Sequence, residues 1–173
     1  MYHFCSYFDK NYLVRGLTLY RSLMRYCEDF VFYVLCLDEE TYRVLSELSS
    51  NCRIYPIKLS SIEKDNSSLL QAKKNRSLVE FYFTLSPILP LYLLDNYDTI
   101  DVVTYLDSDL CFFSSPELIY QELNDQSILI TEHRFPPKLK RLSVWGRFNV
   151  QYLSFRNDTQ GRECLLRWRD QCL

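Results

Sequence analysis

Two acidic residues at positions 107 and 109 are the strongest chemical feature of the sequence. Asp107 and Asp109 flank Ser108 directly after the apolar run Val102–Leu106. Residues two apart in an extended chain project to the same side, so both carboxylates can face one site. Like charges held together repel, and a bound cation removes that penalty. Carboxylate oxygens suit Mg²⁺ or Mn²⁺, which bridge nucleotide phosphates. We therefore predict a metal–diphosphate site at Asp107-Ser108-Asp109, with Asp107 and Asp109 as metal ligands.

A second interpretation of the same triplet is a solvated turn after a strand, because a bare D-x-D arises often by chance. The surrounding elements favour the functional interpretation. Expected strands are Tyr2–Phe8, Phe30–Leu37, Cys52–Leu59, Asp101–Leu106, Ser127–Thr131 and Phe148–Phe155. Expected helices begin at Tyr12, at Glu39 behind an N-cap at Asp38, at Arg76, at Pro116 and at Thr159. The polar stretches 60–74 and 135–146 are expected to be loops, and the helix over Arg76–Leu94 is expected to kink or break at its prolines.

This alternation of strands and helices predicts a single α/β domain over residues 1–173 with a mainly parallel sheet. In open α/β sheets, ligands bind beyond the carboxyl ends of the strands, where the acidic triplet falls.

Composition excludes several other classes of protein. The chain has 173 residues, 47% of them hydrophobic, and a net charge of −2, so it can bury a core and offers no strongly basic face for nucleic acid. The seven cysteines form no C-x-x-C pair, which is typical of reduced thiols. We find no signal peptide, and the apolar stretch Leu78–Leu94 contains Glu80 and two prolines, which favours a core helix over a transmembrane segment. We therefore expect a cytoplasmic protein.

Several stretches resemble GT-A glycosyltransferases, in particular the bacterial nucleotide-diphospho-sugar transferase-like proteins and glycosyltransferase family 8. Val103–Asp109 followed by Phe112–Pro116 is similar to their D-x-D region. The opening strand with Asp9-Lys10-Asn11-Tyr12 resembles their nucleotide-binding start. Glu80–Thr84 with Pro87 resembles the helix before the D-x-D strand, and Phe148-Asn149-Val150 resembles their F-N-x-G strand.

The resemblance implies a three-layer α/β/α sandwich that transfers a sugar from a nucleoside-diphosphate sugar, UDP-sugar being favoured, to an unknown glycan or other acceptor. It implies that Asp109 ligates Mn²⁺ or Mg²⁺ directly and that Asp107 contacts the ribose, or the metal through water. Asn149 would face the donor sugar. The remaining implied donor-binding residues are Tyr7, Phe8, Asp9, Tyr12, Arg76 and Ser108.

Two departures from the family pattern matter. Gln151 stands where relatives usually have Gly after F-N-x, and the D-Q-x-x-L segment of relatives has no convincing counterpart. The chain is therefore expected to lack the acceptor-side segment. The alternative to an active transferase is a truncated or catalytically impaired module that binds nucleotide-sugar.

Other candidates carry weaker signals. A haloacid-dehalogenase-like phosphatase also uses D-x-D after an apolar strand, but that motif sits near the N-terminus and continues to Thr or Val where this chain has Cys111. His133 is equally compatible with a pocket and a surface position. The stretch Lys138-Leu139-Lys140-Arg141 is typical of a solvated loop, and it could also meet phosphates or an anionic membrane surface.

Overall fold

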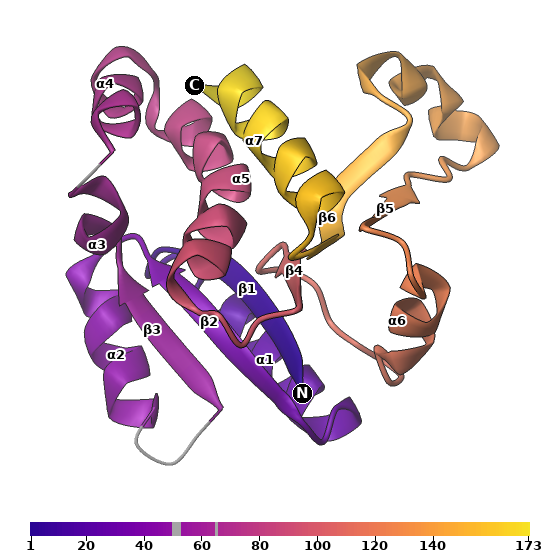
Figure 1. The fold of residues 1–173 in the computed structure, drawn as a ribbon, viewed down its shortest axis with the longest axis horizontal. Coiled ribbons are helices and arrows are strands. Elements are labelled where there is room, and N and C mark those ends of the chain that lie inside the picture. Colours follow the sequence, from indigo (N-terminus) through magenta and orange to yellow (C-terminus); the bar gives the residue numbers. More distant parts are fainter. Residues whose placement is uncertain (50–52, 65) are drawn as a thin grey trace.

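A single six-stranded sheet organises the protein, and its strand order is β3-β2-β1-β4-β6-β5 (Figure 1). The computed structural model describes residues 1–49, 53–64 and 66–173. The strands are β1 (Tyr2–Phe8), β2 (Phe30–Cys36), β3 (Ile54–Lys58), β4 (Val102–Leu106), β5 (Ile128–Glu132) and β6 (Phe148–Arg156). The helices are α1 (Leu13–Tyr26), α2 (Glu39–Ser49), α3 (Leu59–Glu63), α4 (Ser67–Asn75), α5 (Leu78–Asn96), α6 (Glu117–Leu123), the 3₁₀ helix η1 (Pro137–Trp145) and α7 (Thr159–Cys172).

Strand directions confirm the predicted mainly parallel sheet. β1 pairs in parallel with β2 and β4, and β2 pairs in parallel with β3. β6 runs antiparallel to both β4 and β5, so β5 has the same direction as β4. The carboxyl ends of β1, β2, β4 and β5 therefore meet at one edge, and β6 begins at that edge.

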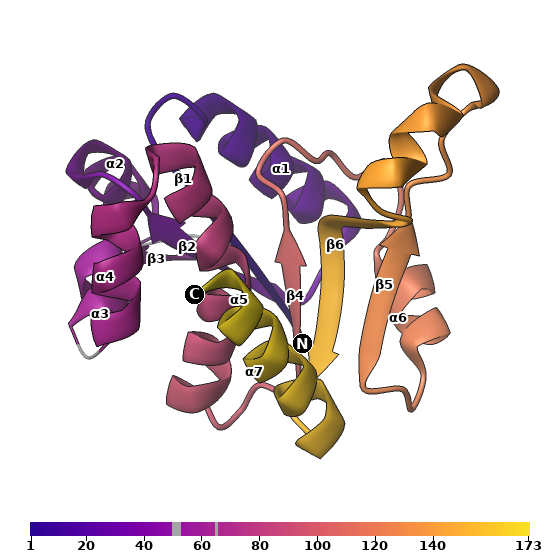
Figure 2. The same cartoon turned by 90° about the horizontal axis from the view of Figure 1, so that it is seen from above.

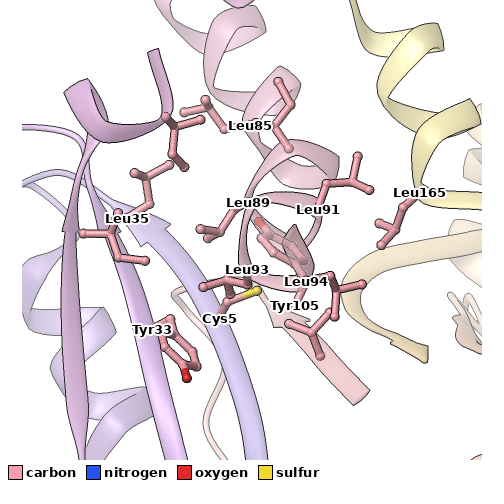
Figure 3. Close-up of a cluster of buried hydrophobic side chains, with 14 of the residues drawn as sticks. Cys5, Tyr33, Leu35, Leu85, Leu89, Leu91, Leu93, Leu94, Tyr105 and Leu165 are labelled. Atoms are coloured by element: carbon pink, nitrogen blue, oxygen red, sulfur yellow. The ribbon is translucent and has the colours of Figure 1, made fainter. Parts of the chain in front are cut away.

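Apolar side chains cover both faces of the sheet and create two cores. On one face, Leu19 and Leu23 of α1 and Leu45 of α2 pack against Phe4 and Phe32. On the other face, α5 lies over the sheet between α4 and α7, as two views at right angles show (Figures 1 and 2). The second core is dominated by α5, whose leucines pack with strand residues and with Leu165 of α7. Its members include Cys5, Tyr33, Leu35, Leu85, Leu89, Leu91, Leu93, Leu94, Tyr105 and Leu165 (Figure 3). The predicted three layers, helices–sheet–helices, are thus confirmed.

The central helix α5 is continuous from Leu78 to Asn96, so the helix does not break at its prolines, one of the two outcomes expected there. It starts with a capping box in which Ser77 and Glu80 satisfy each other's backbone N–H groups. Pro87 and Pro90 are both buried inside the helix. A proline inside a helix costs about 3 kcal/mol, whereas each large apolar side chain buried returns roughly 1.5–3 kcal/mol, so the buried leucines outweigh the two prolines. By length and composition α5 could cross a membrane, but 61% of its apolar window is buried, which suits the predicted core helix.

Two segments expected to be loops are helical instead. Residues 60–74 carry α3 and α4, and the Asn66 side chain caps α4 by accepting a hydrogen bond from Leu69 N at 2.9 Å. Ile62, Leu69 and Ala72 are buried, but each helix is too short to show a periodicity in the sequence. Residues 137–145 form η1 rather than an irregular loop.

The strand predicted over Cys52–Leu59 is described from Ile54, and Cys52 lies outside the described residues. Leu59, expected to end that strand, opens α3. The cysteines in the described part of the chain are free thiols, as predicted, and Cys5, Cys27 and Cys36 are buried.

Candidate functional site

A cavity of about 380 Å³ opens at the carboxyl edge of the sheet. Its walls come from the ends of three parallel strands and from the first turns of α5. The lining residues are Tyr7, Phe8, Asp9, Tyr12, Leu37, Val79, Tyr82, Phe83, Tyr105, Asp107, Ser108 and Asp109. A cavity of this size lies within the range of small-molecule sites, roughly 300–1,000 Å³.

The acidic pair faces this cavity. Asp107 is half-buried and Asp109 is exposed, and both contribute to its lining. Burial raises the pKa of Asp107, the hydrogen bond from Tyr105 acts in the opposite direction, and the nearby charge of Asp109 raises the pKa further. The site thus holds negative charge at a cost, and a bound cation would offset that cost.

Tyr105 holds one oxygen of Asp107 in place. Because residues two apart on a strand share a face, the Tyr105 side chain lies beneath Asp107, and its hydroxyl donates to Asp107 Oδ1 at 2.9 Å. Burial raises the pKa of Tyr105 well above its ordinary value, so the hydroxyl keeps its proton and remains a donor. Asp107 Oδ2 makes no hydrogen bond with the described residues, so it is available to a ligand.

Tyr7 supports the same wall of the cavity from the neighbouring strand. Its hydroxyl shares a hydrogen bond of 2.9 Å with Ser86 Oγ of α5, and its ring centroid lies 5.8 Å from that of Tyr105. These contacts join β1, β4 and α5 directly behind the acidic pair, so the wall is built from buried and mutually bonded side chains.

The turn after β1 is fixed by its own carboxylate and by α2. Asp9 Oδ1 accepts from Asn11 N at 3.0 Å, and Asp9 Oδ2 accepts from Asn11 Nδ2 at 2.9 Å. Asp38 accepts from Lys10 N and from Thr41 N, each at 2.7 Å, so one carboxylate caps α2 and anchors the turn. Burial opposes ionisation of Asp38, but these hydrogen bonds prevail and lower its pKa. The turn presents Tyr12, which is 44% exposed, at the mouth of the cavity.

Most of the predicted site residues come together, and two do not. Tyr7, Phe8, Asp9, Tyr12, Asp107, Ser108 and Asp109 all line the cavity. Arg76 lies outside it and donates to Thr84 Oγ1 at 2.6 Å, to Leu173 O at 2.8 Å and to Cys172 O. Asn149 stands near the start of β6, at the same edge of the sheet, where its Oδ1 accepts from Gln151 N at 3.2 Å. Their roles toward a donor remain predictions.

Sequence reasoning missed five lining residues: Leu37, Val79, Tyr82, Phe83 and Tyr105. Signals for them were present. Val79, Tyr82 and Phe83 have the i, i+3, i+4 spacing of one helix face, and Tyr105 precedes Asp107 by two residues in a strand. Val79 and Phe83 are 59% and 66% exposed, which marks that face of α5 as open to a ligand or to further protein.

The donor atoms available here fit a hard divalent cation with an incomplete protein shell. In the described ranges, no three His, Cys, Asp or Glu side chains form a group able to hold a metal ion. Mg²⁺ commonly uses one or two carboxylates and completes its shell with water and substrate phosphates. Asp107 and Asp109 match that pattern.

Several solved structures with the same architecture are glycosyltransferases. Mouse xyloside xylosyltransferase 1, in its apo form, aligns with a TM-score of 0.63 at 16% identity over 98% of this chain and 74% of that chain. The chain has a GT-A fold. Other GT-A structures align similarly. The galactosyltransferase LgtC, in complex with donor and acceptor sugar analogs, gives a TM-score of 0.58 at 15% identity, over 99% of this chain and 66% of that one. Apo GlyE from Streptococcus pneumoniae TIGR4 gives 0.58 at 20% identity, over 98% and 36%.

Two proteins of Bacillus subtilis (strain 168), whose names assign no activity, are similar to this chain in sequence. YfnF is 31% identical over 179 residues, and YfnD is 29% identical over 173 residues. The alignments cover 98% and 99% of this chain but 57% and 55% of the relatives, so the chain spans about half their length. No protein-family model matches the sequence.

Proposed function

We propose that the chain binds a nucleoside-diphosphate sugar and forms the donor-binding part of a glycosyltransferase. One observation carries the proposal: Asp107 and Asp109 face the same aromatic-lined cavity at the carboxyl edge of a GT-A sheet. The aromatic rings of Tyr7, Tyr12 and Phe83 suit a base and ribose, and the acidic end of the cavity suits a cation-bound diphosphate. UDP is the nucleotide that we favour.

The residues that would hold a metal are Asp107 and Asp109. Mn²⁺ or Mg²⁺ bound there would supply positive charge to a leaving diphosphate. Tyr105 fixes the orientation of Asp107, while the exposed Asp109 can change rotamer to meet its ligand. The protein's contribution is therefore preorganised electrostatics, which requires no protein nucleophile.

Two further side chains are proposed to act on the sugar side of the donor. Asn149 lies at the same sheet edge as the acidic pair and would face the donor sugar. Arg76 borders a neighbouring hollow whose lining includes Phe83, a residue that also lines the cavity, and would approach the diphosphate or sugar. The alternative function is a module that binds nucleotide-sugar with little or no turnover. It is considered because the chain spans about half the length of its relatives.

A thermal-shift panel tests donor binding. UDP, GDP, ADP and CDP are each added to the purified chain with Mn²⁺ and with EDTA. We expect a rise in the unfolding temperature that requires both metal and nucleotide, largest for UDP, because a ligand that binds only the folded state stabilises it. Asp109→Ala should remove the response without lowering the unfolding temperature of the unliganded protein. No metal-dependent response to any nucleotide would refute both functions.

Release of labelled sugar from UDP-sugars separates the two functions. Hydrolysis or transfer that is lost in Asp109→Ala supports a transferase. Metal-dependent binding without release supports the binding module.

A further inference from the structure

A basic arm connects β5 to β6 and projects from the sheet. We define it as residues 133–147, which contain η1. Figure 2 shows this segment, in orange, extending away from the rest of the molecule beyond the ends of β5 and β6. β5 has the same direction as β4, so the arm leaves the sheet at the edge that carries Asp107.

The charge of the arm is one-sided. It contains Arg134, Lys138, Lys140, Arg141 and Arg147, and no acidic residue occurs between Glu132 and Asp158. The whole chain, in contrast, has a net charge of −2. Arg147 is paired with Glu132 at the base of the arm. The other four cations are exposed and form no salt bridge with the described residues, so their charge is free to meet a partner.

Apolar side chains stand exposed among these cations. Val144 is 79% exposed and Leu139 is 42% exposed, and Phe148, where the arm returns to β6, is 48% exposed. In a 3₁₀ helix every third residue lies on the same side, which places Lys138, Arg141 and Val144 along one ridge. Cationic and exposed apolar side chains therefore share one side of η1.

We infer that the basic arm docks the protein on an anionic membrane surface. Cationic side chains interleaved with exposed apolar ones are the composition that binds a bilayer interface, where headgroups attract the charges and the apolar groups enter the boundary. A soluble polyanion would need the cations alone and would leave Val144 and Leu139 without a role. The arm lies at the sheet edge that carries the acidic pair, so docking brings this edge to the membrane. The inference concerns binding to lipid and stands or falls independently of donor binding.

Vesicle co-sedimentation of the 173-residue chain tests the inference. The probes are phosphatidylcholine vesicles with and without phosphatidylglycerol, at low and high ionic strength. We expect binding to the anionic vesicles only, weakened by salt. The triple variant Lys138→Gln/Lys140→Gln/Arg141→Gln should lose on the order of 100-fold in apparent affinity, since each basic residue near an anionic bilayer contributes about fivefold.

A matched control separates the arm from net charge. Arg21→Gln/Lys64→Gln/Lys74→Gln removes the same charge from exposed residues of α1, the α3–α4 region and α4 that form no salt bridge with the described residues. This variant should bind anionic vesicles within about twofold of the unaltered chain, because it leaves the arm intact. An equal loss in both triple variants would overturn the inference, as would absence of vesicle binding by the unaltered chain.

The apolar component has its own test. Val144→Ser should lower vesicle affinity roughly fivefold, because burying a valine side chain is worth up to about 1.5–3 kcal/mol and the interface buries only part of it. It should not change binding to inorganic polyphosphate, a soluble polyanion. If Val144→Ser leaves vesicle affinity unchanged and polyphosphate competes fully, the arm binds anions without a bilayer and the membrane assignment is wrong. The unfolding temperature of each variant verifies that it is folded.

Discussion

The hydroxyl of Tyr105 donates a hydrogen bond to Asp107 Oδ1 at 2.9 Å, and the tyrosine is only 2% exposed. This contact joins the buried core beneath α5 to the acidic pair at the cavity. A carboxylate attached to a strand end can turn about its side-chain bonds, and the tyrosine removes that freedom before any ligand arrives. Preorganisation of this kind improves binding because less conformational freedom is lost when the ligand binds.

Replacing Tyr105 tests this positioning role. Tyr105→Phe keeps the ring and removes the donor, so we expect Mn²⁺-dependent UDP affinity to fall about tenfold, consistent with the roughly 1.5–3 kcal/mol of a hydrogen bond to a charged group. Isothermal titration calorimetry with and without metal measures the change. Tyr33→Phe, in the same core but outside the cavity, is the matched control and should leave the affinity unchanged. Equal affinities for the Tyr105→Phe variant and the unaltered chain would show that the hydroxyl does not position the carboxylate.

Asp107 is predicted to oppose stability at neutral pH while it supports binding. Burial raises its pKa, so the folded state retains a proton that the unfolded state has already lost. Stability therefore declines as pH rises from the ordinary carboxyl value of 3.8 through the raised pKa, and the penalty is complete above it. Asp107→Asn should raise the unfolding temperature at neutral pH, and the difference should vanish below pH 3.8.

The same variant should lose metal-dependent nucleotide binding, because an amide cannot replace a carboxylate charge at the cation. Thermal unfolding across pH, with EDTA and with Mn²⁺ plus UDP, measures both effects. A stability loss at neutral pH in EDTA would mean that the ionised carboxylate is stabilising, contrary to its surroundings.

The fold was predictable because its dominant signals are long and repeated. Buried strands such as Phe30–Cys36 are continuous apolar runs, and the N-cap residue Asp38 indicates where α2 begins. The helices α3 and α4 were not predictable, since one or two turns give no periodicity and their burial depends on distant partners. Likewise, no local pattern reveals that Arg76 meets the end of α7, because that contact joins residues 97 apart in sequence. Tyr105 could have been chosen from the period of a strand alone.

Gly16 allows α1 to approach the cavity wall. A Cβ atom at this position would lie 2.4 Å from Cε1 and Cζ of Phe8, a buried ring that lines the cavity. Alanine gains about 1 kcal/mol of helix propensity over glycine, but overpacking costs about 1–3 kcal/mol. Gly16→Ala should therefore lower the free energy of unfolding by up to about 2 kcal/mol. It should also weaken nucleotide binding severalfold, because the added methyl group displaces the Phe8 ring from the cavity wall.

Thr18→Ala is the matched control for that experiment, because it raises helix propensity at an exposed position of the same helix. Denaturant unfolding and UDP titration of both variants provide the comparison. Gly16→Ala is expected to impair both properties, and Thr18→Ala neither. Tighter nucleotide binding in Gly16→Ala would show that the Phe8 ring does not shape the cavity.

The structure and the family resemblance indicate different roles for Arg76, and substitution of this residue separates them. Its guanidinium donates to Thr84 Oγ1 and to the backbone oxygens of Cys172 and Leu173, so it joins the start of α5 to the end of α7. If these contacts are its main role, Arg76→Met should cost about 1–3 kcal/mol of stability, because it leaves three part-buried acceptors without their donor. UDP affinity in Mn²⁺ should then change less than about twofold. Arg76→Lys should recover part of the stability, because an ammonium reaches fewer of the three acceptors. If Arg76→Met instead retains its unfolding temperature and loses tenfold or more in UDP affinity, as about 1.4 kcal/mol of lost contact would cause, the side chain turns toward the diphosphate when the donor binds.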